Sequence, residues 1–111
     1  MNAIAASGLA DIVAVADATP HLATAAAEAV GANSVRTLEE LLHGDLDGIV
    51  IATPNALHHD QAVAALAQGM AVFCQKPLGR SHDETRAVIA AARRADRLLG
   101  VDLSYRSTAA V

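Results

Sequence analysis

Short apolar segments alternate with longer segments of mixed polarity along the whole chain. The apolar segments are rich in valine, isoleucine and alanine and are bounded by polar residues, which is typical of strands buried in a parallel sheet. Five strands are predicted in this way, at 11–17, 34–35, 47–53, 70–74 and 101–105. The intervening segments are long enough for helical crossovers, so the pattern predicts an α/β fold with a mainly parallel sheet.

The predicted helices begin and end at residues that favour helix boundaries. They are expected at 1–7, 19–30, 37–43, 58–68 and 81–99, and each is followed directly by a glycine. Glycine is common just past a helix end because it adopts the left-handed conformation without a steric cost. Thr19-Pro20 is expected to cap the second helix. Two later starts, Thr37 with Glu40 and Ser81 with Glu84, have the spacing of a capping box.

The composition fits one domain of helices packed on an aliphatic sheet. The 111 residues are the size of a single domain, and 53% of them are apolar whereas only 2% are aromatic. RNA-binding sheets use exposed aromatic side chains, and phosphate contacts need a basic surface. The low aromatic content and the net charge of −4 therefore argue against nucleic acid as a partner. A local basic cluster, formed by Arg86, Arg93, Arg94 and Arg97, is interleaved with Asp83, Glu84 and Asp96, which favours a solvated helix face.

Nothing in the sequence indicates a disulfide, a metal site or a membrane segment. Cys74 is the one cysteine, so neither an internal disulfide nor a cysteine-based metal site is expected. The N-terminal residues lack the basic region and the long apolar core of a signal peptide. No apolar run approaches the roughly 20 residues that span a bilayer. We therefore expect a cytoplasmic protein with no membrane partner.

Asp17 follows the first predicted strand, at the edge where open parallel sheets bind their ligands. In a dinucleotide-binding fold, a carboxylate at this position accepts both hydroxyls of the adenosine ribose. Its charge repels a 2′-phosphate, and Ala18 supplies no arginine to accept one, so NAD is favoured over NADP. Alternatively, Asp17 only begins the turn that leads into Thr19-Pro20.

The segment Thr53-Pro54-Asn55 leaves the clearest predicted strand and leads into a helix that contains His58. The free N–H groups at a helix start, and the positive end of the helix dipole, favour a bound anion or polar ligand. Asn55 and His58 are three residues apart and can both face such a ligand. Alternatively, Asn55 caps the helix, and His58 and His59 are solvated.

Gln75-Lys76-Pro77 follows another buried strand and is therefore also expected at the ligand-binding edge. The proline restricts the backbone, and the strand end holds the Lys76 ammonium in one place. A lysine there can act as an acid or a base in carbonyl or alcohol chemistry beside a nicotinamide. Alternatively, it is an ordinary surface lysine. Cys74 is interpreted as an inert core thiol because no histidine partner can be identified for it.

Together these segments resemble one known family. Asp17 after its strand, Ala-Thr-Pro-Asn-Ala-Leu-His at 52–58, and Cys-Gln-Lys-Pro at 74–77 before a capped helix are similar to the glucose–fructose oxidoreductase / inositol dehydrogenase (Gfo/Idh/MocA) family. The resemblance extends from about Met1 to Tyr105-Arg106. It implies a Rossmann-like doubly wound parallel sheet that binds NAD, with NADP less favoured.

The resemblance also implies roles for individual residues. The cofactor-binding residues would be Asp17, Thr53, Pro54, Asn55, His58, Gln75 and Lys76. Asp17 would bind the adenosine ribose, and the residues from 53 to 58 would line the cleft near the nicotinamide. Lys76 matches the lysine of the family's Glu-Lys-Pro motif, which binds the substrate hydroxyl and assists proton transfer. Gln75 stands where that motif usually has glutamate, and it can hydrogen-bond the ribose but carries no charge.

The glycine-rich phosphate loop of such domains lies roughly 20 residues before the ribose-binding acid, which places it before Met1. Among the seven glycines, no two lie two residues apart, so no other segment replaces the loop. We therefore expect 1–105 to be an incomplete NAD(P)-binding domain that lacks its first strand and Gly-rich loop. Residues 106–111 would begin a substrate domain, which in this family supplies further catalytic residues and usually the interface of a homo-oligomer.

Two classes of function follow from these observations. The first is an NAD(P)-dependent sugar or polyol dehydrogenase, which transfers a hydride between a nicotinamide cofactor and its substrate and is inactive as this fragment. The retained Lys76 favours this class. The second is a non-catalytic nucleotide-sensing module or a decayed gene fragment, which the missing phosphate loop favours.

Overall fold

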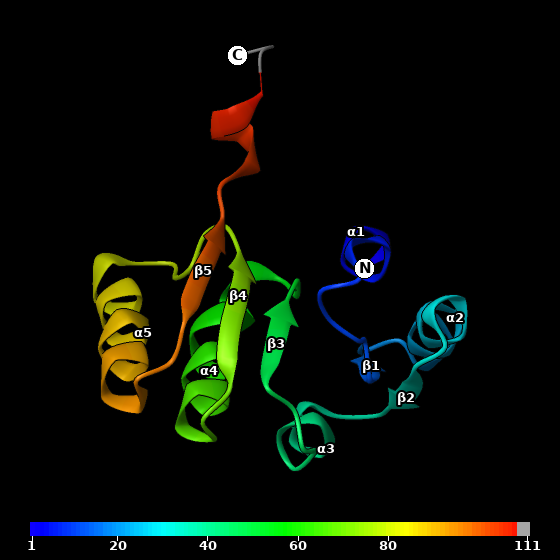
Figure 1. Cartoon of the computed structure of the whole chain (residues 1–111). Helices are drawn as coiled ribbons and strands as arrows, with labels where there is room; N and C mark the ends of the chain where they lie inside the picture. The colour runs from blue at the N-terminus through cyan, green and yellow to red at the C-terminus, as the bar shows by residue number, and fades with distance from the viewer. Residues whose placement is uncertain (109–111) are drawn as a thin grey trace. The chain divides into compact units, whose positions relative to one another are not determined.

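The computed structural model describes residues 1–108 of the chain. The chain forms two compact units, Met1–Leu46 and Asp47–Val111. Residues 109–111, which belong to the predicted start of a second domain at 106–111, lie outside the described residues. Both units consist of parallel strands joined by helices, which confirms the predicted α/β class (Figure 1).

The first unit is built around one helical crossover between two parallel strands. Its elements are α1 (Asn2–Ser7), β1 (Ala14–Ala16), α2 (Pro20–Val30), β2 (Asn33–Val35) and α3 (Leu38–Leu42). The strands β1 and β2 pair in parallel, and α2 packs on both of them. This packing buries Ala23 and Ala27, which lie four residues apart on one face of α2.

Most helix boundaries in the first unit follow the sequence. Gly8 after α1 and Gly31 after α2 adopt the left-handed conformation, with φ of 66° and 71°. At α3, the Thr37 hydroxyl oxygen accepts a hydrogen bond from the backbone N–H of Glu40 at 3.1 Å. The Glu40 carboxylate accepts one from the N–H of Arg36 at 3.0 Å, not from that of Thr37. In the predicted capping box, Glu40 was expected to accept from the N-cap residue Thr37, but it accepts from the residue before the N-cap instead.

The second unit contains a three-stranded sheet. Its elements are β3 (Gly48–Ile51), α4 (Asn55–Ala67), β4 (Ala71–Gln75), α5 (His82–Ala95), β5 (Leu99–Asp102) and a 3-10 helix (Ser104–Ser107). The sheet is parallel throughout and has the order β3-β4-β5. Its register aligns Ile51 with Cys74, and Gln75 with Asp102. The carboxyl ends of the three strands therefore lie along one edge of the sheet.

The core of the second unit lies where α4 and α5 pack together beside the sheet (Figure 1). The most deeply buried apolar residues there are Ile51, Ala62, Ala65, Leu66, Met70, Val72, Cys74 and Val88. The sheet's other face is more open, because Val50 and Phe73, which are register partners, remain 51% and 47% exposed. One face of this sheet thus packs on α4, and the other leaves large apolar side chains exposed.

The boundary between α5 and β5 differs from the prediction. The helix ends at Ala95, and Asp96 takes the left-handed conformation that was expected of Gly100. Aspartate tolerates this conformation better than most residues do. Gly100 lies inside β5 beside Phe73, whose ring would be 2.8 Å from a Cβ at this position. The glycine therefore serves close packing rather than a helix end, and the strand expected at 101–105 occupies Leu99–Asp102.

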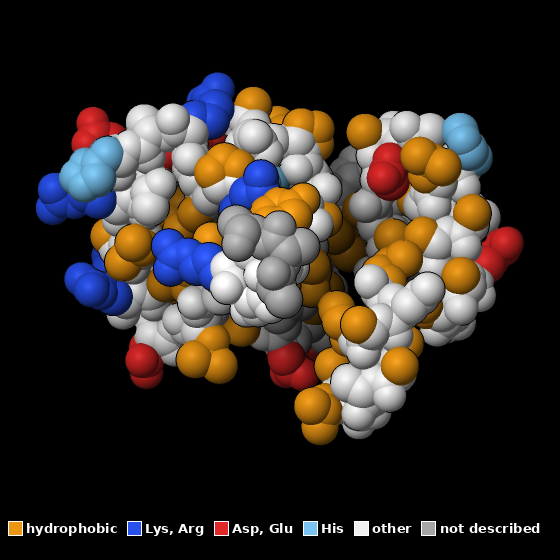
Figure 2. Space-filling model, turned by 90° about the horizontal axis from the view of Figure 1, so that it is seen from above, with side chains coloured by type: hydrophobic (Ala, Val, Ile, Leu, Met, Phe, Trp, Pro, Cys, Tyr) orange, Lys and Arg blue, Asp and Glu red, His pale blue; other side chains and the backbone are white. Residues whose placement is uncertain are grey.

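The arginines of α5 are exposed, as the charge pattern predicts. Arg86, Arg93 and Arg94 are all exposed to solvent. Figure 2 shows lysine and arginine side chains on the unit that contains α5, with acidic side chains among them. The interpretation of this segment as a solvated helix face is confirmed for these three residues.

The described strands form two parallel sheets, β1-β2 and β3-β4-β5. Each strand is also short, and the strand expected at 11–17 is reduced to Ala14–Ala16. Within residues 1–108, β1 pairs with β2 alone, and their ladder runs from Ala14 to Ala16 opposite Asn33–Val35. Among the described residues, no helix has both the length and the apolar character needed to cross a membrane.

Candidate functional site

Most of the predicted site residues lie in or next to two loops at the carboxyl edge of the second unit's sheet. The loop at 52–54 follows β3 and leads into α4, and the loop at 76–81 follows β4 and leads into α5. Because β3 and β4 are adjacent and parallel, both loops leave the sheet at the same edge. The structure therefore brings the segment around Thr53 close to the segment around Lys76.

His58 joins these two loops. Its side chain is buried, with the residue only 1% exposed. Its Nδ1 lies 2.6 Å from the carbonyl oxygen of Pro77, and its Nε2 lies 2.8 Å from that of Thr53. Carbonyl oxygens only accept hydrogen bonds, so the ring donates to the backbone of both loops when it is protonated at both nitrogens, and to one when it is neutral. The alternative that His58 is solvated is wrong.

The start of α4 differs from the prediction as well. The helix begins at Asn55, three residues before the expected start at His58, with Pro54 as its N-cap at φ −58°. Asn55 makes no side-chain capping bond, so its alternative role as a cap is wrong. The Thr53 hydroxyl donates to the Gln61 side-chain oxygen at 2.6 Å. Asn55 is exposed at this edge, and the backbone N–H of Leu57 in the first turn of α4 already donates to the carbonyl oxygen of Pro54 at 2.9 Å.

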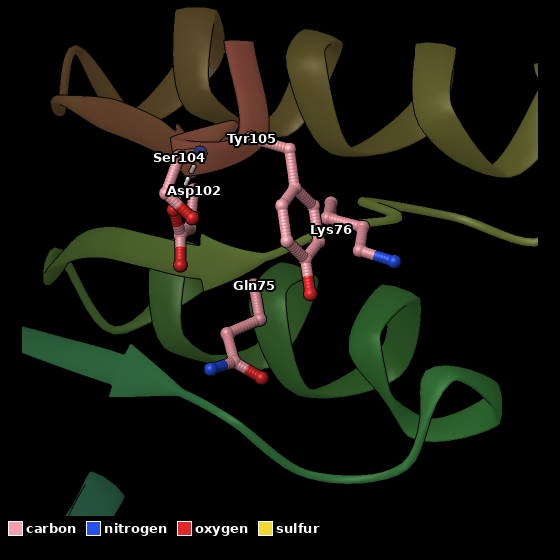
Figure 3. Close-up of a pocket in the computed structure, with 5 residues that line it drawn as sticks. All are labelled: Gln75, Lys76, Asp102, Ser104 and Tyr105. Atoms are coloured by element: carbon pink, nitrogen blue, oxygen red, sulfur yellow. Dashed lines mark hydrogen bonds between the residues drawn. The ribbon is translucent and has the colours of Figure 1, made fainter. Parts of the chain in front are cut away.

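A pocket opens at the ends of β4 and β5 (Figure 3). It has a volume of about 210 Å³ and is lined by Gln75, Lys76, Asp102, Ser104 and Tyr105. The Lys76 ammonium lies 5.7 Å from the centroid of the Tyr105 ring, within the range of a cation–π interaction. Lys76 is exposed, yet it lies at a polar pocket rather than alone on the surface.

Three of the pocket residues were not among the predicted site residues: Asp102, Ser104 and Tyr105. The sequence pattern placed Asp102 inside a strand at 101–105, whereas it is the last residue of β5. The signal that could have identified it is an acid directly after the apolar run 99–101. Asp17 follows its own apolar run in the same way and was recognised by that pattern.

Asp17 belongs to the first unit, where it is exposed after β1. Its Oδ1 accepts a hydrogen bond from the backbone N–H of Thr19 at 2.8 Å, which confirms that Asp17 begins the turn before α2. Thr19 is the N-cap residue, but its side chain makes no capping bond, contrary to prediction. The Asp17 carboxylate orders the chain before the helix instead. No ion pair or second hydrogen bond occupies this carboxylate within residues 1–108.

Cys74 lies in the core rather than at the site. The residue is fully buried, and its thiol donates to the backbone carbonyl of Gln75 at 3.3 Å. Burial raises the pKa of this thiol, which disfavours the reactive thiolate. The interpretation of Cys74 as a core thiol is confirmed. The part of the chain that the structure describes contains no group of three or more histidine, cysteine or acidic side chains placed to hold a metal ion.

The chain is similar to one family of proteins over nearly its whole length. A family profile described as an oxidoreductase family with an NAD-binding Rossmann fold matches residues 1–103. Inositol 2-dehydrogenase from Rhizobium meliloti is 40% identical over 92 residues, which make up 80% of this chain and 28% of that protein. The chain spans about a quarter of the length of the curated relatives it matches.

Solved structures show the same fold. The WlbA dehydrogenase from Bordetella pertussis, in complex with NADH and UDP-GlcNAcA, has a TM-score of 0.86 and 28% identity, covering 94% of this chain and 30% of its own. A 3-ketoreductase from Actinomadura kijaniata, in complex with NADP, has a TM-score of 0.90 and 26% identity, covering 96% of this chain and 33% of its own. The described elements therefore form a Rossmann-like fold.

Proposed function

The chain belongs to the Gfo/Idh/MocA oxidoreductase family with an NAD-binding Rossmann fold, and we propose that it forms most of the cofactor-binding domain of an NAD(P)-dependent sugar or polyol dehydrogenase. The observation that carries the proposal is the pair of polar loops at the ends of β3 and β4, which the buried His58 ring joins. Relatives named for inositol or levoglucosan support a sugar or polyol as substrate.

The residues present fit the adenosine end of a dinucleotide. One oxygen of the exposed Asp17 carboxylate is held by the N–H of Thr19, which leaves the other free to accept ribose hydroxyls. The negative charge repels a 2′-phosphate, and the following Ala18 offers no positive charge to offset it. Solved relatives hold either NADH or NADP, and this charge argument favours NAD for this chain.

The loops of the second unit suit the nicotinamide end. The 53–55 segment and Gln75 would line the cofactor there, and His58 would act by holding both loops. A bound nicotinamide supplies or accepts the hydride. Lys76 would bind the substrate hydroxyl and take up or return its proton. The Tyr105 ring, 5.7 Å from the Lys76 ammonium, helps to keep that ammonium at the pocket.

The pyrophosphate end does not fit the residues present, because the 111 residues contain no Gly-x-Gly-x-x-Gly turn. We propose that 1–105 correspond to a nucleotide-binding domain without its first strand and Gly-rich loop, and that 106–111 begin a substrate domain. In the Rossmann strand order, the first strand pairs with the second and the fourth. If the first strand is missing, β1 corresponds to the second strand of the Rossmann order and β3 to the fourth. The division into the sheets β1-β2 and β3-β4-β5 supports this assignment, because the missing strand would pair with β1 and with β3.

A second candidate function is a nucleotide-sensing module without catalysis, or a decayed fragment of an oxidoreductase. The absence of the glycine turn from the 111 residues favours it, since tight binding of the pyrophosphate depends on that turn and on its helix start. The pocket at Lys76 favours the dehydrogenase instead.

The proposal is tested by titrating the ¹⁵N-labelled 111-residue chain with NAD⁺ and recording backbone amide shifts. We expect weak binding, with a Kd of about 1 mM or higher, shifts at 17–19 and 75–76, and no dehydrogenase turnover. Asp17→Ala should remove the shift at Thr19, whereas Asp11→Ala, which changes another exposed acid before β1, should not. A Kd in the low micromolar range would contradict the incomplete site. An absence of saturable shifts at both segments would contradict the cofactor-binding role.

A further inference from the structure

The pocket at the ends of β4 and β5 contains one carboxylate, that of Asp102. The residue is half-buried at the last position of β5, and its register partner in β4 is Gln75. Residues opposite each other on parallel strands project from the same face of a sheet. The side chains of Gln75 and Asp102 both line the pocket (Figure 3).

The Asp102 carboxylate is held in place but keeps an acceptor free. Its Oδ1 accepts a hydrogen bond from the backbone N–H of Ser104 at 2.9 Å, which restricts the motion of the carboxylate (Figure 3). Its Oδ2 takes part in no hydrogen bond or ion pair among residues 1–108. The basic group that lines the same pocket, Lys76, contacts the Tyr105 ring instead. The unpartnered carboxylate oxygen can therefore accept hydrogen bonds from the hydroxyl groups of a ligand.

We infer that Asp102 binds a vicinal diol in this pocket. This inference rests on the proposed function, because it names the group that such a site would recognise in a ribose or a polyol. The free carboxylate oxygen accepts the hydroxyl hydrogens, and the Gln75 amide can donate or accept beside it. Tyr105, which is 70% exposed, presents a ring face for the C–H groups of a small cyclic ligand. The volume of about 210 Å³ suits one sugar ring rather than a larger molecule.

Gln75 and Asp102 are register partners on adjacent strands, so a carboxylate can be moved from one to the other. Gln75 carries no charge, so the pocket's negative charge comes from the neighbouring strand, at the same register position. Exchanging the two side-chain types across the strands, in Gln75→Glu/Asp102→Asn, keeps the net charge and returns one carboxylate to the pocket. If the carboxylate binds the diol, this exchange should restore what Asp102→Asn alone removes.

The test follows amide shifts of Gln75, Asp102 and Ser104 in the ¹⁵N-labelled 111-residue chain during titration with D-ribose, and separately with myo-inositol. We expect saturable shifts with a Kd in the millimolar range. Asp102→Asn, which keeps the acceptor for the Ser104 N–H, should weaken binding at least about fivefold. The double variant should recover most of the loss. Asp83→Asn removes a fully exposed acid in the first turn of α5 and should bind like the unchanged chain.

Unchanged affinity in Asp102→Asn, a double variant no better than the single one, or no saturable shift with either sugar would overturn the inference. A preference for ribose assigns the diol to the nucleotide, and a preference for inositol assigns it to the substrate. The NAD⁺ titration separates this outcome from the proposed function. If NAD⁺ causes no saturable shifts while a sugar still binds at Asp102, the cofactor proposal fails and the diol site stands.

Discussion

His58 shows how one buried polar residue can join the two loops of the candidate site. It is the one buried polar residue among those described, and both of its ring nitrogens lie at backbone carbonyls of the two site loops. Replacing it by leucine leaves the carbonyls of Thr53 and Pro77 without these partners in a dry environment. We expect His58→Leu to lower the free energy of unfolding by about 2 to 4 kcal/mol, measured by urea denaturation.

The neighbouring His59 provides a matched control. Its side chain is partly exposed and contacts Asp60 at the surface, so His59→Leu should change the free energy of unfolding by less than about 0.5 kcal/mol. Equal denaturation midpoints for the two variants would show that the bonds of His58 add nothing to stability.

At the residue scale, the sequence predicted the location of the candidate residues better than their contacts. The 53–58 and 75–77 segments were expected at a sheet edge and lie there. Burial of His58 could not be predicted, because the carbonyl of Pro77 that it contacts is 19 residues away along the chain. Asp102 was missed because the strand was expected at 101–105, which placed this acid inside the strand instead of at its end. Its place in the pocket also depends on the pairing of β5 with β4.

The start of α5 illustrates how a local element gains stability from a few charges. The Ser81 hydroxyl accepts a hydrogen bond from the N–H of Glu84, and the Glu84 carboxylate accepts bonds from the side chain and backbone N–H of Arg80. The bonds from Arg80 lower the pKa of Glu84 from 4.5 to about 2, with the Arg80 side chain as the largest cause. Because the folded pKa is the lower one, this stabilisation is present above pH 4.5 and is lost as the pH falls through about 2.

We therefore expect Glu84→Gln to lower stability above pH 4.5 and to lose this difference from the unchanged chain near pH 2. Urea denaturation across that pH range measures the effect. Glu39→Gln is the control, because Glu39 lies in the first turn of α3 and its carboxylate makes no hydrogen bond or ion pair within residues 1–108. A difference between Glu84→Gln and the unchanged chain that stays constant with pH would contradict the assigned role of the carboxylate.

Helix ends were predictable where the conformation of a single glycine sets them. They were not predictable where the pairing of the following strand sets them. Gly8 and Gly31 end their helices because they adopt positive φ. Gly100 was expected to end a helix because it follows a helix-like apolar pattern. Instead it lies inside a strand, because Leu99–Asp102 pairs with β4. Asp96 then ends the helix with a φ of 51°, a conformation that the sequence pattern does not mark at an aspartate.

At the scale of the whole molecule, the two units differ in how much apolar surface they bury. The first unit buries only Ala23 and Ala27, whose side chains are single methyl groups. The second buries larger residues as well, among them Leu66, Met70 and Val88. Burial contributes about 0.8 kcal/mol per CH₂ group, so the second unit gains far more stability from its core. The α/β class was predictable from strand and helix alternation, whereas this division depends on which strands find neighbours.

Hydrogen exchange should report this difference directly. Backbone amides open locally with free energies that range from near zero up to that of global unfolding, and segments with few buried contacts open most easily. We expect peptides from α2 and β2 to exchange at least about tenfold faster than peptides from α4 and β4, after correction for intrinsic rates. The measurement is deuterium uptake followed by mass spectrometry, with the urea-unfolded chain as the control in which both regions exchange alike. Equal protection of both regions in the folded chain would contradict this prediction. It would mean that the first unit opens only when the second unit unfolds, so that the two units unfold cooperatively.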